Sequence, residues 1–374
     1  MAGIYIHIPF CKQACHYCNF HFSTSLLLKE KMIQAIMKEL VLQRSYLGDQ
    51  VVETIYFGGG TPSLLLDEDI KKILDTIYEN FTVAAKEITL EGNPDDLTGN
   101  KLTELKESGI NRLSIGIQSF LDADLLWMNR AHNADQSALC IKNAIQQGFT
   151  NISADLIYGI PDQTDEQWKT NIQKMIDFGI PHISCYALTV EPNTALQYFI
   201  EKKKTKAPDE QQAAGNYATL REILQQHNYD HYEISNFAKD KRYALHNTAY
   251  WKGKWYLGVG PSAHSFNGTS RQWNVANNAL YIQNIEQENI PFEAEMLSTV
   301  QQANETVMTS LRTMWGLDLA AFKENFGEHH YEQILFEAKS HLQKNNLVIE
   351  DDHLLIAPQT KFIADGIISD LFLS

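Results

Sequence analysis

The chain has 374 residues, which is long enough for one large domain with a smaller one, or for two medium domains. Its composition, 44% hydrophobic and 21% charged, is typical of a globular protein, and no apolar run approaches the ~20 residues that span a bilayer. A net charge of −15 disfavours long-range attraction to nucleic acid or anionic membrane. The N-terminus lacks the features of a signal peptide, and three of the five cysteines crowd into residues 11–18. This pattern indicates a metal site in a reducing cytoplasm and excludes a disulfide scaffold.

Short segments rich in Ile, Leu or aromatic residues alternate with amphipathic stretches over the first half of the chain. The segments predict six buried parallel strands, and the stretches predict helices that connect them as right-handed βαβ units. Thr164 with Gln167 predicts a capping box at one helix start. Periodicity leaves open a doubly wound sheet or a partial (β/α)6 barrel. The predicted strands are 4–8, 54–57, 87–91, 112–117, 151–156 and 182–186, and the predicted helices are 29–47, 67–80, 99–108, 135–147 and 165–178.

The pattern changes after residue 209. A helix (210–226) and a short strand (232–234) precede a stretch dense in Tyr, Trp and Gly, from 246 to 273. From residue 299 the predicted order is three helices, two short strands and a final helix, which resembles a winged-helix module. Residues 320–374 contain nine Asp or Glu against four Lys and no Arg. We therefore interpret this region as a packing or gating module and expect no nucleic-acid partner.

Three cysteines follow the first predicted strand in the motif Cys11-Lys-Gln-Ala-Cys15-His-Tyr-Cys18. Thiolate sulfur suits iron–sulfur clusters or zinc. Three thiolates can hold three irons of a 4Fe-4S cube and leave the fourth iron open to another ligand. The spacing alone leaves a structural zinc site as an alternative, completed by His7, His16 or His21.

Further candidate ligand-binding residues mark the ends of the later strands. The loop Gly58-Gly59-Gly60-Thr61-Pro62 follows the second strand, where adjacent glycines allow close approach of a ligand. Asp155 lies in an otherwise apolar strand, and a buried carboxylate requires a partner. Each of these residues has an unremarkable structural reading when taken singly. The other candidates are Glu91, Gln118 and Arg130.

Taken together, these motifs resemble the radical S-adenosylmethionine superfamily and, within it, the oxygen-independent coproporphyrinogen oxidase branch. The resemblance covers essentially the whole chain and implies an α/β fold with a partial (β/α)6 barrel. It also implies that Cys11, Cys15 and Cys18 bind a 4Fe-4S cluster and that Gly59, Gly60 and Thr61 face the methionine end of S-adenosylmethionine. The residues implied to line the same ligand are Tyr5, Glu91, Gln118, Arg130, Asp155 and Ala187.

That branch contains a dehydrogenase and haem-binding chaperones. The dehydrogenase has a fourth cysteine two residues after the third and a long extension before the motif, whereas this chain has Phe20 there and starts ten residues before Cys11. The sequence His246-Asn-Thr-Ala-Tyr250-Trp251 has the HNxxYW form typical of the chaperones. His246 and Tyr250 offer axial ligands for haem iron, and Trp251 offers a surface for the porphyrin. A purely structural aromatic cluster is the alternative, and His264 is a weaker second candidate ligand.

We therefore expect a cytoplasmic haem chaperone that binds a 4Fe-4S cluster, S-adenosylmethionine and haem, and we assign no catalytic residue. Its expected partners are haem and respiratory haem-protein acceptors, with transfer at the membrane surface and a homodimer both left open. The alternatives are a coproporphyrinogen III dehydrogenase and, more remotely, a zinc-stabilised protein without redox chemistry. The expected domains are a core (1–237), an aromatic connecting segment (238–298) and a C-terminal helical, winged-helix-like domain (299–374).

Overall fold

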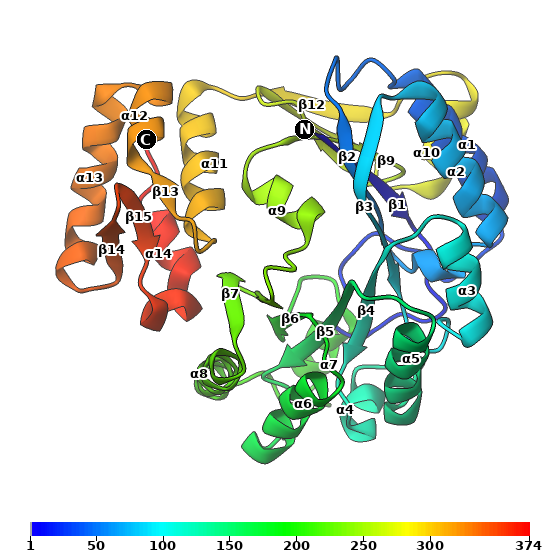
Figure 1. Cartoon of the computed structure of the whole chain (residues 1–374), viewed down its shortest axis with the longest axis horizontal. Coiled ribbons are helices and arrows are strands. Elements are labelled where there is room, and N and C mark those ends of the chain that lie inside the picture. Colours follow the sequence, from blue (N-terminus) through cyan, green and yellow to red (C-terminus); the bar gives the residue numbers. More distant parts are fainter. Residues whose placement is uncertain (1) are drawn as a thin grey trace.

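Residues 2–374 are described by a computed structural model, in which six parallel strands form the centre of one twelve-stranded sheet. The strands pair in chain order and curve into a partial barrel, with the connecting helices on its outer face (Figure 1). The α/β fold with a partial (β/α)6 barrel is therefore confirmed. The strands are β1 (Ala2–Ile8), β2 (Val52–Gly59), β3 (Val83–Gly92), β4 (Arg112–Gln118), β5 (Ile152–Tyr158) and β6 (His182–Ala187), and the helices are α1 (Lys29–Leu42), α2 (Asp67–Asn80), α3 (Gly99–Glu107), α4 (Asp122–Trp127), α5 (Ala134–Gln146) and α6 (Asp165–Asp177).

The helix boundaries follow local chemistry. The capping box predicted at Thr164 is confirmed, because its hydroxyl accepts from the Gln167 backbone N–H at 3.3 Å while the side-chain Oε1 of Gln167 accepts from the Thr164 backbone N–H at 2.8 Å. The helix predicted over 29–47 ends earlier, at Leu42, and the chain continues as turns to residue 49. Leu47 lies in those turns and is only 1% exposed. Because this buried leucine continues the apolar pattern of the helix, the predicted helix was too long.

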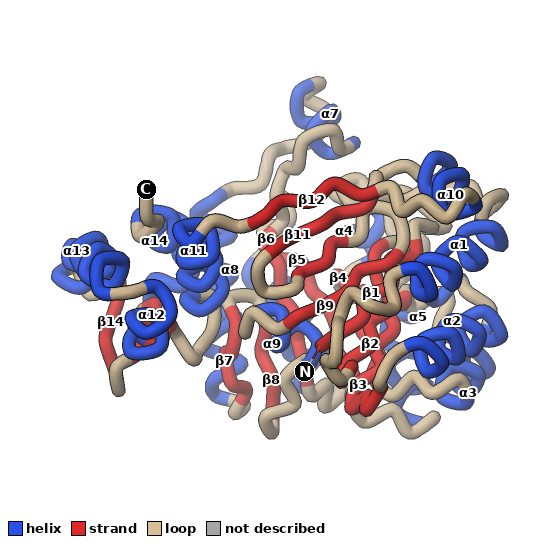
Figure 2. The backbone as a smooth tube through the Cα atoms, turned by 90° about the horizontal axis from the view of Figure 1, so that it is seen from above, coloured by secondary structure: helices blue, strands red, loops and turns tan. Residues whose placement is uncertain are grey.

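Both edges of the barrel sheet are extended by later segments. At one edge, β9 (Trp255–Val259) pairs in parallel with β1, and β10 (His264–Phe266), β11 (Ser270–Asn274) and β12 (Phe292–Met296) follow in antiparallel order, as Figure 2 shows from above. At the other edge, β8 (Asn236–Lys239) and β7 (Tyr229–Glu233) add to β6. The segment expected to be a connection, 238–298, thus contributes strands to the same sheet. This segment also contains the helices α9 (Leu245–Trp251) and α10 (Asn278–Glu286). Two further helices, α7 (Ala195–Glu201) and α8 (Glu210–Gln226), lie between β6 and β7.

The C-terminal region has its own small core and its own sheet, of order β13-β15-β14. Its order of helix, strand, two helices and two strands is that of a winged helix, and it lies beside the open side of the barrel (Figure 1). Within residues 2–374, no helix is long and apolar enough to cross a membrane. The elements are α11 (Thr299–Leu311), β13 (Leu317–Asp318), α12 (Leu319–Phe326), α13 (Glu328–Gln343), β14 (Leu347–Glu350), β15 (His353–Ile356) and α14 (Ala364–Asp370).

Candidate functional site

The loop after β1 brings Cys11, Cys15 and Cys18 to one cavity of about 450 Å³ at the carboxyl ends of the parallel strands. All three thiols are free and half-buried. The Thr61 hydroxyl donates to the Cys11 sulfur at 3.4 Å, and Nη1 of Arg130 donates to the Cys15 sulfur at the same distance. Burial raises the pKa of the Cys11 thiol to about 11, and the hydrogen bond from Thr61 opposes that rise.

The histidines near the cysteine motif contact backbone carbonyl oxygens. His16 Nδ1 lies 2.8 Å from the Trp127 carbonyl oxygen, and His7 Nε2 lies 2.9 Å from that of His21. The cavity itself presents three thiols, which suits the three cysteine ligands of a 4Fe-4S cluster with one open iron.

The same cavity gathers most of the residues expected around S-adenosylmethionine. One expected residue is absent from its lining: Tyr5, which lines a second cavity instead. Asp155 lies in the middle of β5, because that strand continues two residues beyond its predicted end. Neighbours that the sequence analysis missed include Tyr17, Asn93 and Ser114. The expected residues that line the cavity are Gly59, Gly60, Thr61, Glu91, Gln118, Arg130, Asp155 and Ala187.

Two half-buried carboxyl groups, those of Glu91 and Asp155, give this cavity its acidic side. Glu91 accepts hydrogen bonds from the Tyr56 hydroxyl at 2.7 Å and from the Gly59 N–H at 3.2 Å. Burial, with a smaller contribution from the charge of Asp155, raises the pKa of Glu91 to about 7. Burial also raises the pKa of Asp155 to about 6. A ligand with a positive charge or with hydroxyl donors at this position would stabilise both carboxylates.

Arg130 supplies the opposite charge from the loop after α4. Its Nη2 donates to the Asn93 side-chain oxygen at 2.6 Å and to the Gly116 carbonyl oxygen at 2.9 Å. Its Nε is buried without a hydrogen-bond partner, and within residues 2–374 the guanidinium forms no ion pair with a carboxylate. Its hydrogen-bond partners are neutral groups and a thiol, and its charge partly offsets the rise in the pKa of Asp155, so its guanidinium is available to an anionic ligand.

The glycines after β2 have a packing role that the sequence analysis did not foresee. Gly59 has a φ of 102°, and a Cβ there would lie 2.5 Å from the His7 ring. A Cβ on Gly60 would lie 2.6 Å from the Phe10 carbonyl oxygen. The Thr61 N–H donates to that same oxygen at 2.7 Å. The glycines therefore let the loop pack tightly against the start of the cysteine loop, so that the Thr61 hydroxyl reaches Cys11.

A second cavity, of about 940 Å³, adjoins the first and is lined by His246, Tyr250 and Trp251 of α9. Its lining shares four residues with the first cavity: Asn19, Phe20, Glu91 and Tyr186. The side chain at position 20, where the dehydrogenase has cysteine, is 67% exposed and lies beside both cavities. A ligand in the second cavity would thus lie next to one in the first.

His246 is held in an orientation that leaves one ring nitrogen free. Its Nδ1 lies 2.9 Å from the Thr54 hydroxyl, and its ring packs on Tyr56 with centroids 5.1 Å apart. Among residues 2–374, Nε2 has no hydrogen-bond partner. Burial lowers the pKa of His246 to about 4, so the imidazole is neutral at pH 7, as metal ligation requires. Gly3 provides space, since a Cβ there would lie 2.9 Å from the His246 ring.

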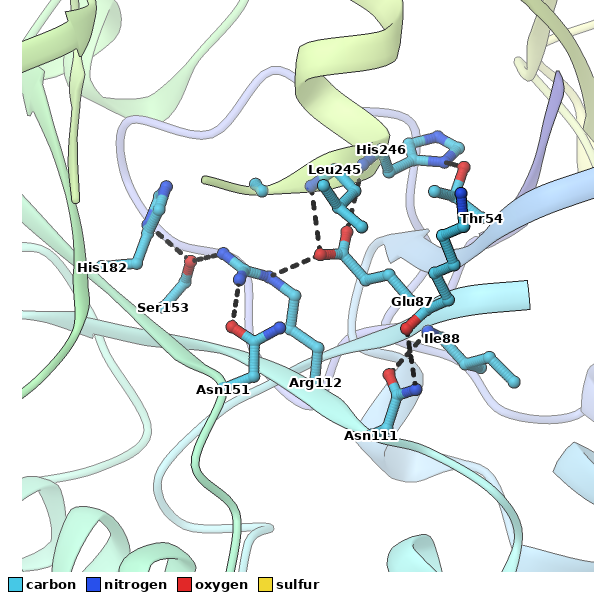
Figure 3. Close-up of polar contacts among 12 residues, drawn as sticks. Thr54, Glu87, Ile88, Asn111, Arg112, Asn151, Ser153, His182, Leu245 and His246 are labelled. Carbon is cyan, nitrogen blue, oxygen red and sulfur yellow. Dashed lines mark hydrogen bonds and ion pairs between the residues drawn. The ribbon is translucent and has the colours of Figure 1, made fainter. Parts of the chain in front are cut away.

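The start of α9 is fixed by a buried charged network at the amino-terminal ends of the barrel strands (Figure 3). The Glu87 carboxylate accepts from the backbone N–H groups of Leu245 and His246 at 3.0 and 3.1 Å. Nε of Arg112 lies 3.9 Å from Glu87, and both side chains are 1% exposed. The Arg112 Nη atoms donate to the side chains of Asn151 and Ser153, each at 2.5 Å. The sequence did not single out this network, because β3 contains the charged residues Lys86 and Glu91 as well as Glu87.

Comparisons with known proteins agree with this geometry. A family model described as the radical SAM superfamily matches residues 5–175. The haem chaperone HemW of Bacillus subtilis is 35% identical over 332 residues, which cover 87% of each chain. HemW of Mycobacterium tuberculosis (strain H37Rv) is 31% identical over 375 residues, covering 99% of this chain and 94% of the relative.

Among solved structures, the chain is similar to HemN of Escherichia coli, described as a coproporphyrinogen III oxidase and radical SAM enzyme. The TM-score is 0.86 over 99% of this chain and 90% of that one, at 22% sequence identity. At that identity the likeness concerns the fold, including the C-terminal region, and carries no information about the reaction.

Proposed function

Because this chain belongs to the HemW family of the radical SAM superfamily, we propose that it is a haem chaperone that binds a 4Fe-4S cluster, S-adenosylmethionine and haem. The observation that supports this proposal best is the pair of adjoining cavities. One is lined by three free cysteines and the other by the HNxxYW helix, and Glu91 and Tyr186 line both. Such an arrangement suits a cofactor and a carried ligand held side by side.

In the first cavity, Cys11, Cys15 and Cys18 would hold the cluster. When bound, the cluster supplies an open iron position and a single electron. Arg130 would bind the carboxylate of S-adenosylmethionine, and Glu91 and Asp155 would bind its cationic groups or ribose hydroxyls. Gln118 and Ala187, at the ends of their strands, would complete the walls, while Tyr5 would act from the neighbouring cavity.

In the second cavity, the free Nε2 of the neutral His246 would be an axial ligand for haem iron. Trp251 and Tyr250, whose ring centroids lie 5.1 Å apart, would pack against the porphyrin. Haem held in this way would be transferred to acceptor proteins, and respiratory haem proteins are the acceptors that we propose.

The proposal is tested by a haem titration run beside an enzyme assay on the anaerobically reconstituted protein. We expect a stable Soret shift with haem, and we expect no protoporphyrinogen from coproporphyrinogen III, even with S-adenosylmethionine and a reductant. Changing His246, Tyr250 and Trp251 together to Ala should weaken haem binding by about tenfold or more. Changing His329 and His330 to Ala, on α13 outside both cavities, should leave it intact.

The outcomes distinguish the two functions of this branch. Robust turnover of coproporphyrinogen III would show that the protein is a dehydrogenase, although it has Phe20 in place of the fourth cysteine. Haem binding that survives the triple change would move the iron ligand away from α9, and His264, which also lines the second cavity, would then be the next candidate.

A further inference from the structure

Three cationic side chains are among the residues that line the second cavity, in a chain whose net charge is −15. Lys254 follows α9, Arg271 lies on β11, and Arg312 caps the end of α11. Two carboxylates, Glu91 and Glu233, share this lining. The lining thus places three cationic side chains in the same cavity as the aromatic side chains of α9 and β9.

Arg312 connects the cavity to the C-terminal region. Its guanidinium lies 5.3 Å from the centre of the Trp251 ring, its Nε lies 3.6 Å from Glu233, and its Nη1 pairs with Asp365. Among residues 2–374, its Nη2 has no hydrogen-bond partner. A ligand packed on Trp251 would thus have an unused cationic donor at its edge.

Arg271 and Lys254 provide further unused donors. Nε of Arg271 lies 2.9 Å from Glu305 on α11, but within residues 2–374 neither of its Nη atoms donates a hydrogen bond to protein. The Lys254 ammonium is exposed and, in the same part of the chain, has no ion-pair partner. A guanidinium has five N–H donors, so Arg271 can keep its contact with Glu305, Arg312 can keep its two carboxylates, and each arginine can still donate to one more carboxylate through its unused N–H groups.

From this geometry we infer that Arg271, Arg312 and Lys254 form a carboxylate-binding subsite that anchors the two propionate groups of haem at the boundary with the C-terminal region. The inference rests on the proposed function and adds to it the contacts of the carboxylate-bearing edge of the ligand. Its ligand class is a flat aromatic macrocycle with two carboxylates at one edge. The cavity volume of about 940 Å³ lies at the upper end for small-molecule sites, which suits a ligand of this size.

The test compares haem with haem dimethyl ester, in which both carboxylates are neutral, using Soret titrations of the full-length protein. The wild type should bind haem about tenfold or more tightly than the ester, because charge-assisted contacts are lost with the ester. The variant Arg271→Gln/Arg312→Gln should bind haem about tenfold more weakly and should bind the two ligands within about twofold of each other. Arg242→Gln, on an exposed turn, is the matched control and should keep the preference for haem.

Lys254→Gln covers the case in which the double variant does not fold, because this exposed lysine has no structural partner. It should reduce the preference for haem over its ester by about two- to fivefold, whereas Lys241→Gln should leave it unchanged. Equal binding of haem and ester by the wild type would overturn the subsite while leaving the haem-chaperone function intact. Binding of neither ligand would overturn the proposed function, and the subsite with it.

Discussion

At the scale of single residues, the five cysteines illustrate how environment decides role. Cys140 and Cys185 are 2% and 1% exposed in the main core, where a free thiol packs as a small apolar group. The three cysteines of the loop are half-buried and line a cavity. The donors from Thr61 and Arg130 reach the sulfurs of Cys11 and Cys15 and would stabilise the thiolate form.

The contrast predicts different outcomes for otherwise equal substitutions. Cys→Ser at position 11, 15 or 18 should reduce iron in the anaerobically reconstituted protein from about four atoms per chain to less than about half of that. Cys→Ser at 140 or 185 should leave the iron content unchanged and affect only thermal stability. Iron and acid-labile sulfide analysis measures the first effect. Stoichiometric zinc without iron in the wild type would contradict the cluster assignment.

At the scale of elements, the parallel strands could be predicted because they are buried on both faces and read as short apolar runs. The strand-end candidates could be placed together for the same reason, since parallel strands end at one edge. The position of α9 could not be predicted. Its start is fixed by Glu87 and Arg112, whose partners lie far away in the sequence, and local patterns carry no information about such pairing. The tight packing of Gly59 against His7 could not be predicted either, because these two residues are also far apart in the sequence.

Glu87 therefore has a predicted function in positioning His246. Glu87→Gln should lower the free energy of unfolding by about 3 kcal/mol, because it leaves Arg112 buried with its charge unpaired. It should also weaken haem binding by about tenfold, since the start of α9 loses a charged acceptor. Denaturant unfolding and Soret titration under folding conditions measure the two effects. Glu107→Gln, exposed on α3, is the control, and unchanged haem binding in a folded Glu87→Gln protein would remove Glu87 from this role.

At the scale of the whole molecule, the C-terminal region has a separate small core and also contributes Arg312 to the lining of the second cavity. Arg312 contacts Trp251 of the HNxxYW motif, and Lys361 donates to the His231 carbonyl oxygen of β7 at 3.1 Å. Trp315, which precedes β13, packs against Tyr232 and Tyr243, while the Lys252 ammonium lies 4.1 Å from the centre of its ring. These contacts orient the winged-helix-like fold toward the barrel, which is the packing role that its acidic composition favoured over DNA binding.

The charge of α13 makes the DNA question testable. In winged-helix proteins that bind DNA, affinity depends largely on cations facing phosphates. Helix α13 instead has Glu328, Glu332 and Glu337 against a single lysine, Lys339. We expect no change in the fluorescence anisotropy of a labelled DNA duplex in about 50 mM salt with protein up to about 10 μM, where non-specific binders already associate. The variant with all three glutamates changed to Lys, a change of six charge units in one helix, should gain salt-sensitive binding and shows that the assay can detect it. Salt-dependent binding of the duplex by the wild type would contradict the packing role and would indicate that the C-terminal region binds nucleic acid.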